Sequence, residues 1–176
     1  MAKEQDATLE GLKTALQMEI DGKEFYLKSS KASKNKLGKE LLKKLAGEED
    51  IHRKVFQNIY DTLKKQKGWP DVTFTGDAGK NLRTVFAQAI DEMDKSVNSM
   101  PQETDAVKTA MGMENKTFDY YNSRAKQGAY DAEKQLFSAL SLQESEHYRI
   151  LQDYYEFLKD PAGWFVKKEH TSVDGG

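Results

Sequence analysis

Apolar residues recur every three or four positions along four long stretches of the chain, and this spacing predicts amphipathic helices. The expected helices cover residues 6–33, 36–67, 104–126 and 130–158. Each is longer than an average globular helix, and such lengths are typical of bundles in which every helix spans the domain. The pattern therefore predicts an all-α protein.

The connections between these stretches differ in length. Only a few residues separate the first helix from the second and the third from the fourth, so each pair is expected to form an antiparallel hairpin. The interval 68–101 is much longer and contains a short helical stretch, residues 82–97. We therefore expect a four-helix bundle over residues 1–160 with one long crossover, followed by a tail over residues 161–176 in which His170 lies at the surface.

Composition and charge narrow the possible functions. The 27 Lys and Arg nearly balance the 29 Asp and Glu, so the chain lacks the basic excess of a nucleic-acid binder. No apolar window approaches the roughly 18 residues of a membrane span, and the first residues show no secretory signal. We expect a cytoplasmic protein without a membrane or nucleic-acid partner. Cysteine is absent, so any metal must be bound by nitrogen and oxygen ligands.

Two short motifs place polar residues on the apolar stripes of their helices. The stretch GEEDIH carries Glu49 and His52, and the stretch QESEHY carries Glu144 and His147. Residues three positions apart share one face of a helix, so each pair can reach one metal ion. The two pairs are separated by the same offset of 95 residues, as the numbering shows (144 − 49 and 147 − 52).

The offset of 95 residues extends beyond the two motifs. It relates Glu19 to Glu114 and Tyr26 to Tyr121, and each isolated Glu precedes the Glu of its motif by 30 residues (49 − 19 and 144 − 114). The correspondence continues without an insertion from about residue 12 to residue 60. We interpret it as an internal duplication of a helical hairpin.

The duplication predicts a dinuclear metal site. One Glu from each of two helices and a Glu-x-x-His from each of the other two is the ligand set of di-iron and di-manganese bundles. The predicted ligands are Glu19, Glu49, His52, Glu114, Glu144 and His147. Four carboxylates balance the charge of two divalent cations. Carboxylate with imidazole suits Fe, Mn or Zn better than Ca or Cu. Glu49 and Glu144 are expected to bridge, and Glu19 and Glu114 to bind different ions.

Two tyrosines and three further acids lie on the same helices as the predicted ligands. Tyr26 and Tyr121 lie two turns beyond a predicted ligand. Each could donate its hydroxyl to a ligating carboxylate, or each could be an amphipathic tyrosine of the core. The remaining acids of the two motifs, Glu48, Asp50 and Glu146, are expected to face water.

Four stretches, ALQMEIDGKEFY, GEEDIH, AMGMENKTFDYY and QESEHY, resemble the rubrerythrin branch of the ferritin-like superfamily. The resemblance covers the four bundle helices. It implies a ferritin-like bundle with a non-haem di-iron centre that reacts with hydrogen peroxide or oxygen during oxidative stress. It also implies a homodimer and an external electron-donor protein such as a rubredoxin.

The chain departs from the rubrerythrin pattern in two places. The family usually carries a rubredoxin domain with four cysteines, and this chain has none. The family also has an additional Glu one turn after the third-helix ligand, where this chain has Thr117, with Gly22 as the equivalent residue in the first half. This replacement argues against a redox-linked ligand switch and against efficient peroxidase turnover. We expect the two small residues to leave an opening beside the metals for the oxidant.

Two other functions fit the same ligand set. Bacterioferritin uses it for iron oxidation and storage in a hollow multi-subunit cage. A non-catalytic helical bundle could also keep a core that metal ions stabilise. The oxidoreductase is the function that we expect, with iron as the metal and manganese or zinc as alternatives.

Overall fold

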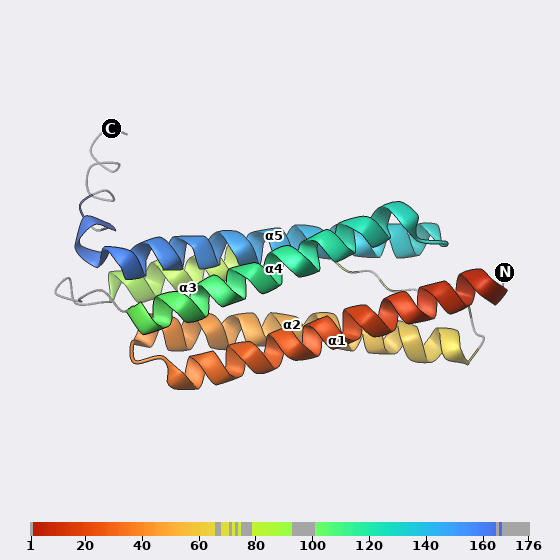
Figure 1. Ribbon diagram of the computed structural model, residues 1–176, viewed down its shortest axis with the longest axis horizontal. Helices are drawn as coiled ribbons and strands as arrows, with labels where there is room; N and C mark the ends of the chain where they lie inside the picture. The colour runs from red at the N-terminus through yellow and green to blue at the C-terminus, as the bar shows by residue number, and fades with distance from the viewer. Residues whose placement is uncertain are drawn as a thin grey trace.

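The computed structural model describes residues 2–65, 68–70, 72, 74, 79–92, 101–164 and 166. These residues form no strand, and the all-α prediction is confirmed. The helices are α1 (Ala2–Ala32), α2 (Lys36–Lys64), α3 (Lys80–Asp91), α4 (Pro101–Gln127) and α5 (Asp131–Lys159), as Figure 1 shows. A further helical turn follows over residues 161–164.

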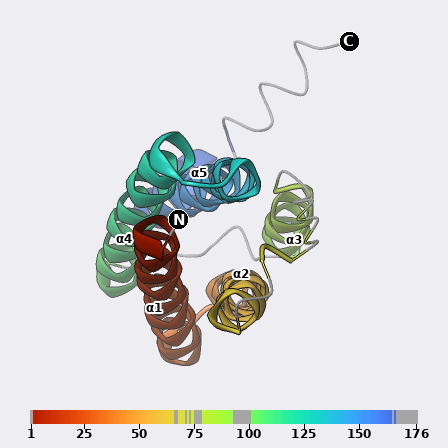
Figure 2. The ribbon, with the colours of Figure 1, turned by 90° about the vertical axis from the view of Figure 1, so that its right-hand side faces the viewer.

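The four long helices form two antiparallel hairpins that lie side by side. Helix α1 pairs with α2, and α4 pairs with α5 (Figure 1). Helix α1 also contacts α4, and α2 contacts α5, which closes the bundle. The short helix α3 lies outside the four and packs against α2 and α5 (Figure 2). The arrangement is that of a ferritin-like bundle with one long crossover between its hairpins.

Two apolar clusters fill the bundle, one toward each end. On α2 the first cluster occupies residues 37–46 and the second occupies residues 56–63. On α5 the first cluster occupies residues 150–158 and the second occupies residues 136–140. Both Glu-x-x-His motifs fall in the gaps between the two clusters. The core therefore has a polar level at mid-height, enclosed above and below by apolar side chains.

The helix ends differ from the predicted ends by a few residues. Helix α1 begins at Ala2 because residues 2–5 are good helix formers that continue the pattern. Helix α2 ends at Lys64 rather than at residue 67, because the Lys65 N–H turns back to the Thr62 carbonyl. Pro101 is part of α4, since a first-turn residue needs no N–H partner. Helix α3 covers Lys80–Asp91, and the predicted residues 93–97 lie outside the described part.

A buried carboxylate joins the hairpins at the end of the bundle where α4 turns into α5. Glu133 is fully buried, accepts hydrogen bonds from Thr8 Oγ1 (2.9 Å) and the Ala129 N–H (3.0 Å), and pairs with Arg124. Thr8 belongs to α1 and Glu133 to α5, so this contact links the first hairpin to the second.

A second carboxylate joins the hairpins at the opposite end. Glu103 of α4 accepts hydrogen bonds from Asn35 Nδ2 (2.6 Å), Tyr154 Oη (2.7 Å) and the Lys34 N–H (2.7 Å). Asn35 also caps α2 by accepting from the Gly38 N–H at 2.6 Å. The turn between α1 and α2 is thereby held against the start of α4.

The described part of the tail packs on the bundle. The Trp164 ring meets Phe86 of α3 at 5.9 Å and Phe157 of α5 at 6.4 Å, both edge-on. His170 lies outside the described residues. Among the helices that the structure describes, none has the length and apolar character needed to cross a membrane.

Candidate metal centre

The six predicted ligands meet at the polar level of the bundle core. They come from α1, α2, α4 and α5, and each is at most 3% exposed. Their side-chain atoms form two groups that could each hold a metal ion, and Glu49 and Glu144 belong to both. Glu19 and His52 complete one group, and Glu114 and His147 complete the other. We call the six residues the Glu/His cluster.

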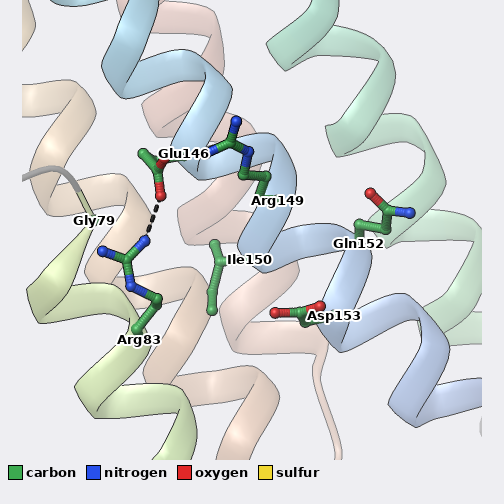
Figure 3. A pocket seen from close by; sticks show the side chains of 7 residues that line it. All are labelled: Gly79, Arg83, Glu146, Arg149, Ile150, Gln152 and Asp153. Atoms are coloured by element: carbon green, nitrogen blue, oxygen red, sulfur yellow. Dashed lines mark hydrogen bonds and ion pairs between the residues drawn. The ribbon is translucent and has the colours of Figure 1, made fainter.

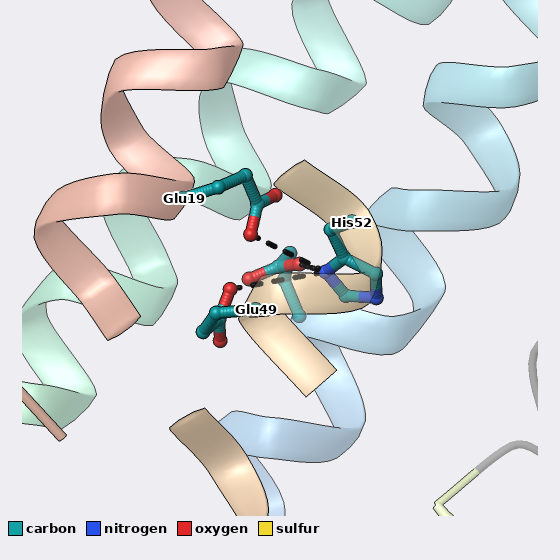
Figure 4. Close-up of side chains that lie close together, drawn as sticks. Glu19, Glu49 and His52 are labelled. Carbon is teal, nitrogen blue, oxygen red and sulfur yellow. Dashed lines mark ion pairs between the residues drawn. The ribbon is translucent and has the colours of Figure 1, made fainter. Parts of the chain in front are cut away.

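The two groups have nearly the same geometry. His52 Nδ1 lies 3.4 Å from Glu19 Oε2 and 3.2 Å from Glu144 Oε1. His147 Nδ1 lies 3.5 Å from Glu114 Oε2 and 3.1 Å from Glu49 Oε1. Figure 4 shows the carboxylates of Glu19 and Glu49 turned toward the His52 ring. The two imidazole rings stack with centroids 5.7 Å apart and planes 12° apart. The duplication seen in the sequence is thus also a local two-fold arrangement.

The cluster leaves polar atoms unsatisfied although it is sealed from water. Each of its six residues has one buried oxygen or nitrogen without a hydrogen-bond partner of acceptable geometry. Those atoms are Glu19 Oε2, Glu49 Oε1, His52 Nδ1, Glu114 Oε2, Glu144 Oε1 and His147 Nδ1. An unpaired buried polar atom is costly, so such atoms seldom converge without a ligand. The donor set therefore fits metal cations.

Burial and crowding also shift the acidity of the cluster. Burial and the charge of Glu49 raise the pKa of Glu19 and of Glu144 well above the ordinary carboxyl value. Burial alone would lower the pKa of His52, but the carboxylates of Glu19, Glu144 and Glu49 outweigh it and raise that pKa. The pKa of His147 is raised in the same way by the acids that face it. Burial alone would raise the pKa of Glu49, but hydrogen bonds donated by Glu19, His147 and His52 outweigh it and lower that pKa well below the ordinary value. Metal cations compete with protons for the atoms of the cluster.

Two buried tyrosines donate to the cluster across the bundle. Tyr26 of α1 donates its hydroxyl to Glu114 Oε1 of α4, and Tyr121 of α4 donates to Glu19 Oε1 of α1. Burial, followed by the charge of the carboxylate that accepts each bond, raises the pKa of both phenols, so both stay protonated donors. Of the two interpretations of these tyrosines, the contacts favour the one in which they orient carboxylates of the cluster.

Glu48 was missed by the sequence analysis, and the prediction that it faces water is wrong. Its side chain is only 13% exposed, and its Oε2 lies 3.3 Å from His147 Nε2, the ring nitrogen that points away from the cluster. The equivalent residue in the second half is the uncharged Gln143. His52 instead meets the ring of Phe74 edge-on at 5.4 Å. The helix turn that aims Glu49 inward also brings Glu48 to the rim of the cluster.

The other two acids of the motifs do not simply face water either: each is largely covered, with Asp50 20% and Glu146 14% exposed, and pairs with basic side chains. Asp50 accepts from Lys23 (2.8 Å) and Arg53 (2.9 Å), and these bonds hold the pKa of its carboxyl well below its ordinary value. Glu146 pairs with Arg83 of α3 and with Arg149 (2.6 Å) at a surface pocket of about 330 Å³ (Figure 3). This pairing holds the start of α3 against α5.

Of the two small residues at the predicted opening, Gly22 of α1 lies next to the cluster. A Cβ added at Gly22 would stand 3.6 Å from Glu49 Cγ and Cδ, which is ordinary contact. Thr117, the equivalent residue on α4, is buried, and its hydroxyl bonds back to the Met113 carbonyl at 3.1 Å. Neither position carries a carboxylate that could join the cluster.

Comparison with known protein families identifies the family of the chain. The family model described as Rubrerythrin matches residues 10–155, which include all six residues of the Glu/His cluster. No curated protein and no solved structure matches the chain.

Proposed function

Because the chain belongs to the rubrerythrin family, we propose that its Glu/His cluster binds two redox-active metal ions and reduces hydrogen peroxide or oxygen. Iron is the metal that we propose, since carboxylate and imidazole together suit it. The buried carboxylate and imidazole groups fit a di-iron protein of this family.

One observation carries the proposal. Each of the six residues aims one unsatisfied buried atom into the same small volume, and the atoms fall into two groups that share Glu49 and Glu144. A mononuclear site would leave part of this set without a partner. Two adjacent cations use all six residues and balance the four carboxylate charges.

The residues have distinct tasks in this proposal. Glu49 and Glu144 hold the two metal positions close together, and His52 and His147 each mark one position. Bound ferrous ions supply the two electrons that, with two protons, convert one hydrogen peroxide into two waters. Burial keeps bulk water away, so charge in the centre interacts strongly with the fixed carboxylates.

We further propose that the electrons are restored from outside the chain. The sequence contains no cysteine, so it carries no iron–thiolate relay of its own. A separate electron-carrier protein, such as a rubredoxin, or a small reductant fills this role. We also propose that the chain acts as a homodimer.

The test loads metal-free protein anaerobically with about two Fe(II) per chain and then adds hydrogen peroxide. We expect rapid loss of peroxide, one molecule for each pair of ferrous ions, with a rise in near-ultraviolet absorbance. Zn(II)-loaded protein is the control, because it fills the same ligands but supplies no electrons. Slow or absent oxidation of the iron-loaded protein would contradict the proposal and favour a metal-stabilised, non-catalytic bundle.

Size-exclusion chromatography tests the proposed assembly and separates it from iron storage. A small oligomer is expected. Elution as a large multi-subunit shell, together with uptake of many iron ions per chain, would contradict our proposal and support storage.

A further inference from the structure

The two tyrosines that donate to the Glu/His cluster have different neighbours on their outer side. The Tyr121 ring lies 6.1 Å from the ring of Tyr120, the next residue on α4. Tyr120 is partly exposed and donates its hydroxyl to the Gly11 carbonyl at 3.0 Å. A continuous path of two phenols therefore runs from the carboxylate of Glu19, through Tyr121, to the surface.

The first half of the molecule has the inner phenol but lacks the outer one. Tyr26 donates to Glu114, and its ring lies 6.1 Å from the ring of Phe25. The offset of 95 residues makes Phe25 the equivalent of Tyr120. The ring distances agree in the two halves, but a phenylalanine has no hydroxyl proton to lose and resists one-electron oxidation. Among the tyrosines that the structure shows bonded to the cluster, Tyr121 has a second phenol behind it on the way to the surface and Tyr26 does not.

We propose that Tyr121 and Tyr120 form a relay, on one side of the cluster, that carries oxidising equivalents from the metal centre to the surface. Tyr26, backed by Phe25, serves only to orient Glu114. This inference rests on the proposed function, because it requires that the metal centre react with peroxide.

The relay supplies the missing electron when the centre holds a single ferrous ion. Reduction of one hydrogen peroxide to two waters takes two electrons and two protons. Solvent supplies both protons, and one bound ferrous ion would supply one electron. Tyr121 supplies the second electron and passes its phenolic proton to Glu19, which already accepts its hydrogen bond. Tyr120 then reduces the Tyr121 radical, the proton returns from Glu19 to Tyr121, and Tyr120 loses its own proton to water.

The outcome is a phenoxyl radical at the partly exposed Tyr120, where a one-electron reductant such as ascorbate can restore the phenol. Peroxide is thereby reduced fully although the metal site is half-filled. Without the relay, the one-electron reaction of peroxide with a lone ferrous ion leaves the second oxidising equivalent inside the core.

The test uses full-length protein loaded anaerobically with one Fe(II) per chain, mixed with one hydrogen peroxide per chain and frozen within seconds. Electron paramagnetic resonance then measures the tyrosyl radical, and a parallel sample measures remaining peroxide. We expect a radical in the wild type that ascorbate removes rapidly. Tyr120→Phe copies the residue of the other half, so it should fold, and its radical should persist on Tyr121 when ascorbate is added.

Two further variants sharpen the test. Phe25→Tyr completes the second path and should move part of the ascorbate-sensitive radical to position 25, with the total still at most one radical per chain. Tyr155→Phe removes a tyrosine at a distance from the cluster and should match the wild type. If peroxide is consumed and Tyr120→Phe gives the same radical with the same ascorbate sensitivity as the wild type, or if no radical forms, the relay is wrong and the proposed function stands. If peroxide is consumed at two Fe(II) per chain but not at one, the relay fails and the proposed function stands. If peroxide is consumed at neither loading, the proposed function fails, and the relay fails with it.

Discussion

The two halves of the molecule agree at the Glu/His cluster and differ immediately around it. The distances from His52 and His147 to the facing carboxylates agree within about 0.1 Å, at 3.4 and 3.2 Å in one group and 3.5 and 3.1 Å in the other. Around the cluster, equivalent positions carry different residues. Glu48 corresponds to Gln143, and Phe25 corresponds to Tyr120. The duplication thus preserves the six residues of the cluster and gives each of the two groups its own surroundings.

The two ends of the bundle show the same behaviour. Thr8 meets Glu133 at one end, and their equivalents Glu103 and Gly38 meet at the other, where a Cβ on Gly38 would lie 3.0 Å from Glu103 Oε2. Each end thus has one carboxylate. At one end it belongs to Glu133, and at the other it belongs to Glu103, the equivalent of Thr8. A carboxylate is kept at each end of the bundle, although the position that carries it differs. The fold therefore needs a carboxylate contact at each end, and not a particular residue at one of the two equivalent positions.

The largest expected effect comes from removing a residue that both groups share. Glu49→Ala should reduce bound metal from about two ions per chain to less than one, since both positions lose a ligand. Glu19→Ala should remove or weaken only one ion, since Glu19 belongs to one group. Elemental analysis of protein reloaded with Fe(II) under argon measures both. Equal metal loss in the two variants would contradict the shared position of Glu49.

The next largest effect is on stability and compares the two ends of the bundle. Glu133→Ala leaves the guanidinium of Arg124 without its partner in a largely buried site, at a cost of about 3 kcal/mol. Glu103→Ala acts at a partly exposed site and should cost about 1 kcal/mol. Urea unfolding of the metal-free proteins measures both without interference from metal binding. Equal losses would show that burial of the carboxylate does not matter.

A smaller effect separates the two metal positions. Glu48 accepts from the outer nitrogen of His147, which orients the ring and strengthens it as a ligand. Glu48→Gln should lower metal affinity at that position by roughly 10- to 100-fold. Gln143→Glu introduces a carboxylate at the equivalent place and should make the two affinities more alike. Calorimetric titration with Mn(II) measures the two steps, and two unchanged steps in Glu48→Gln would refute the role of Glu48.

The smallest effect concerns the opening beside α1. Gly22→Ala adds a methyl group in ordinary contact with Glu49, and alanine favours a helix over glycine by about 1 kcal/mol. We expect a small gain in stability, an unchanged metal content and a slower reaction with peroxide, because the methyl group narrows the approach to Glu49. Thermal unfolding, metal analysis and stopped-flow absorbance measure these three quantities. Loss of metal would show that Gly22 is needed for packing.

The sequence predicted the fold class and the family, and both are confirmed. The prediction succeeded because a fixed offset of 95 residues relates Glu49 and His52 to Glu144 and His147. Polar residues that merely face solvent are not expected to repeat at one fixed offset. The six residues of the cluster could therefore be named, and the structure brings them together. Their service as metal ligands stays a prediction.

The residues that the sequence did not reveal depend on contacts between helices. Glu133 follows a turn and resembles an ordinary first-turn acid, yet Thr8 and Arg124 enclose it. Glu48 lies at the border of the apolar stripe, and only the position of α5 decides that it faces His147. The bonds of Tyr26 and Tyr121 cross from one hairpin to the other. Periodicity along one helix gives no information on such pairs.

The most direct test of a two-metal centre is a crystal structure of Mn(II)-loaded protein with anomalous scattering. We expect two peaks about 3.5–4 Å apart, both within reach of Glu49 and Glu144. One peak should lie beside Glu19 and His52, and the other beside Glu114 and His147. A single peak, or no peak within the Glu/His cluster, would contradict the account.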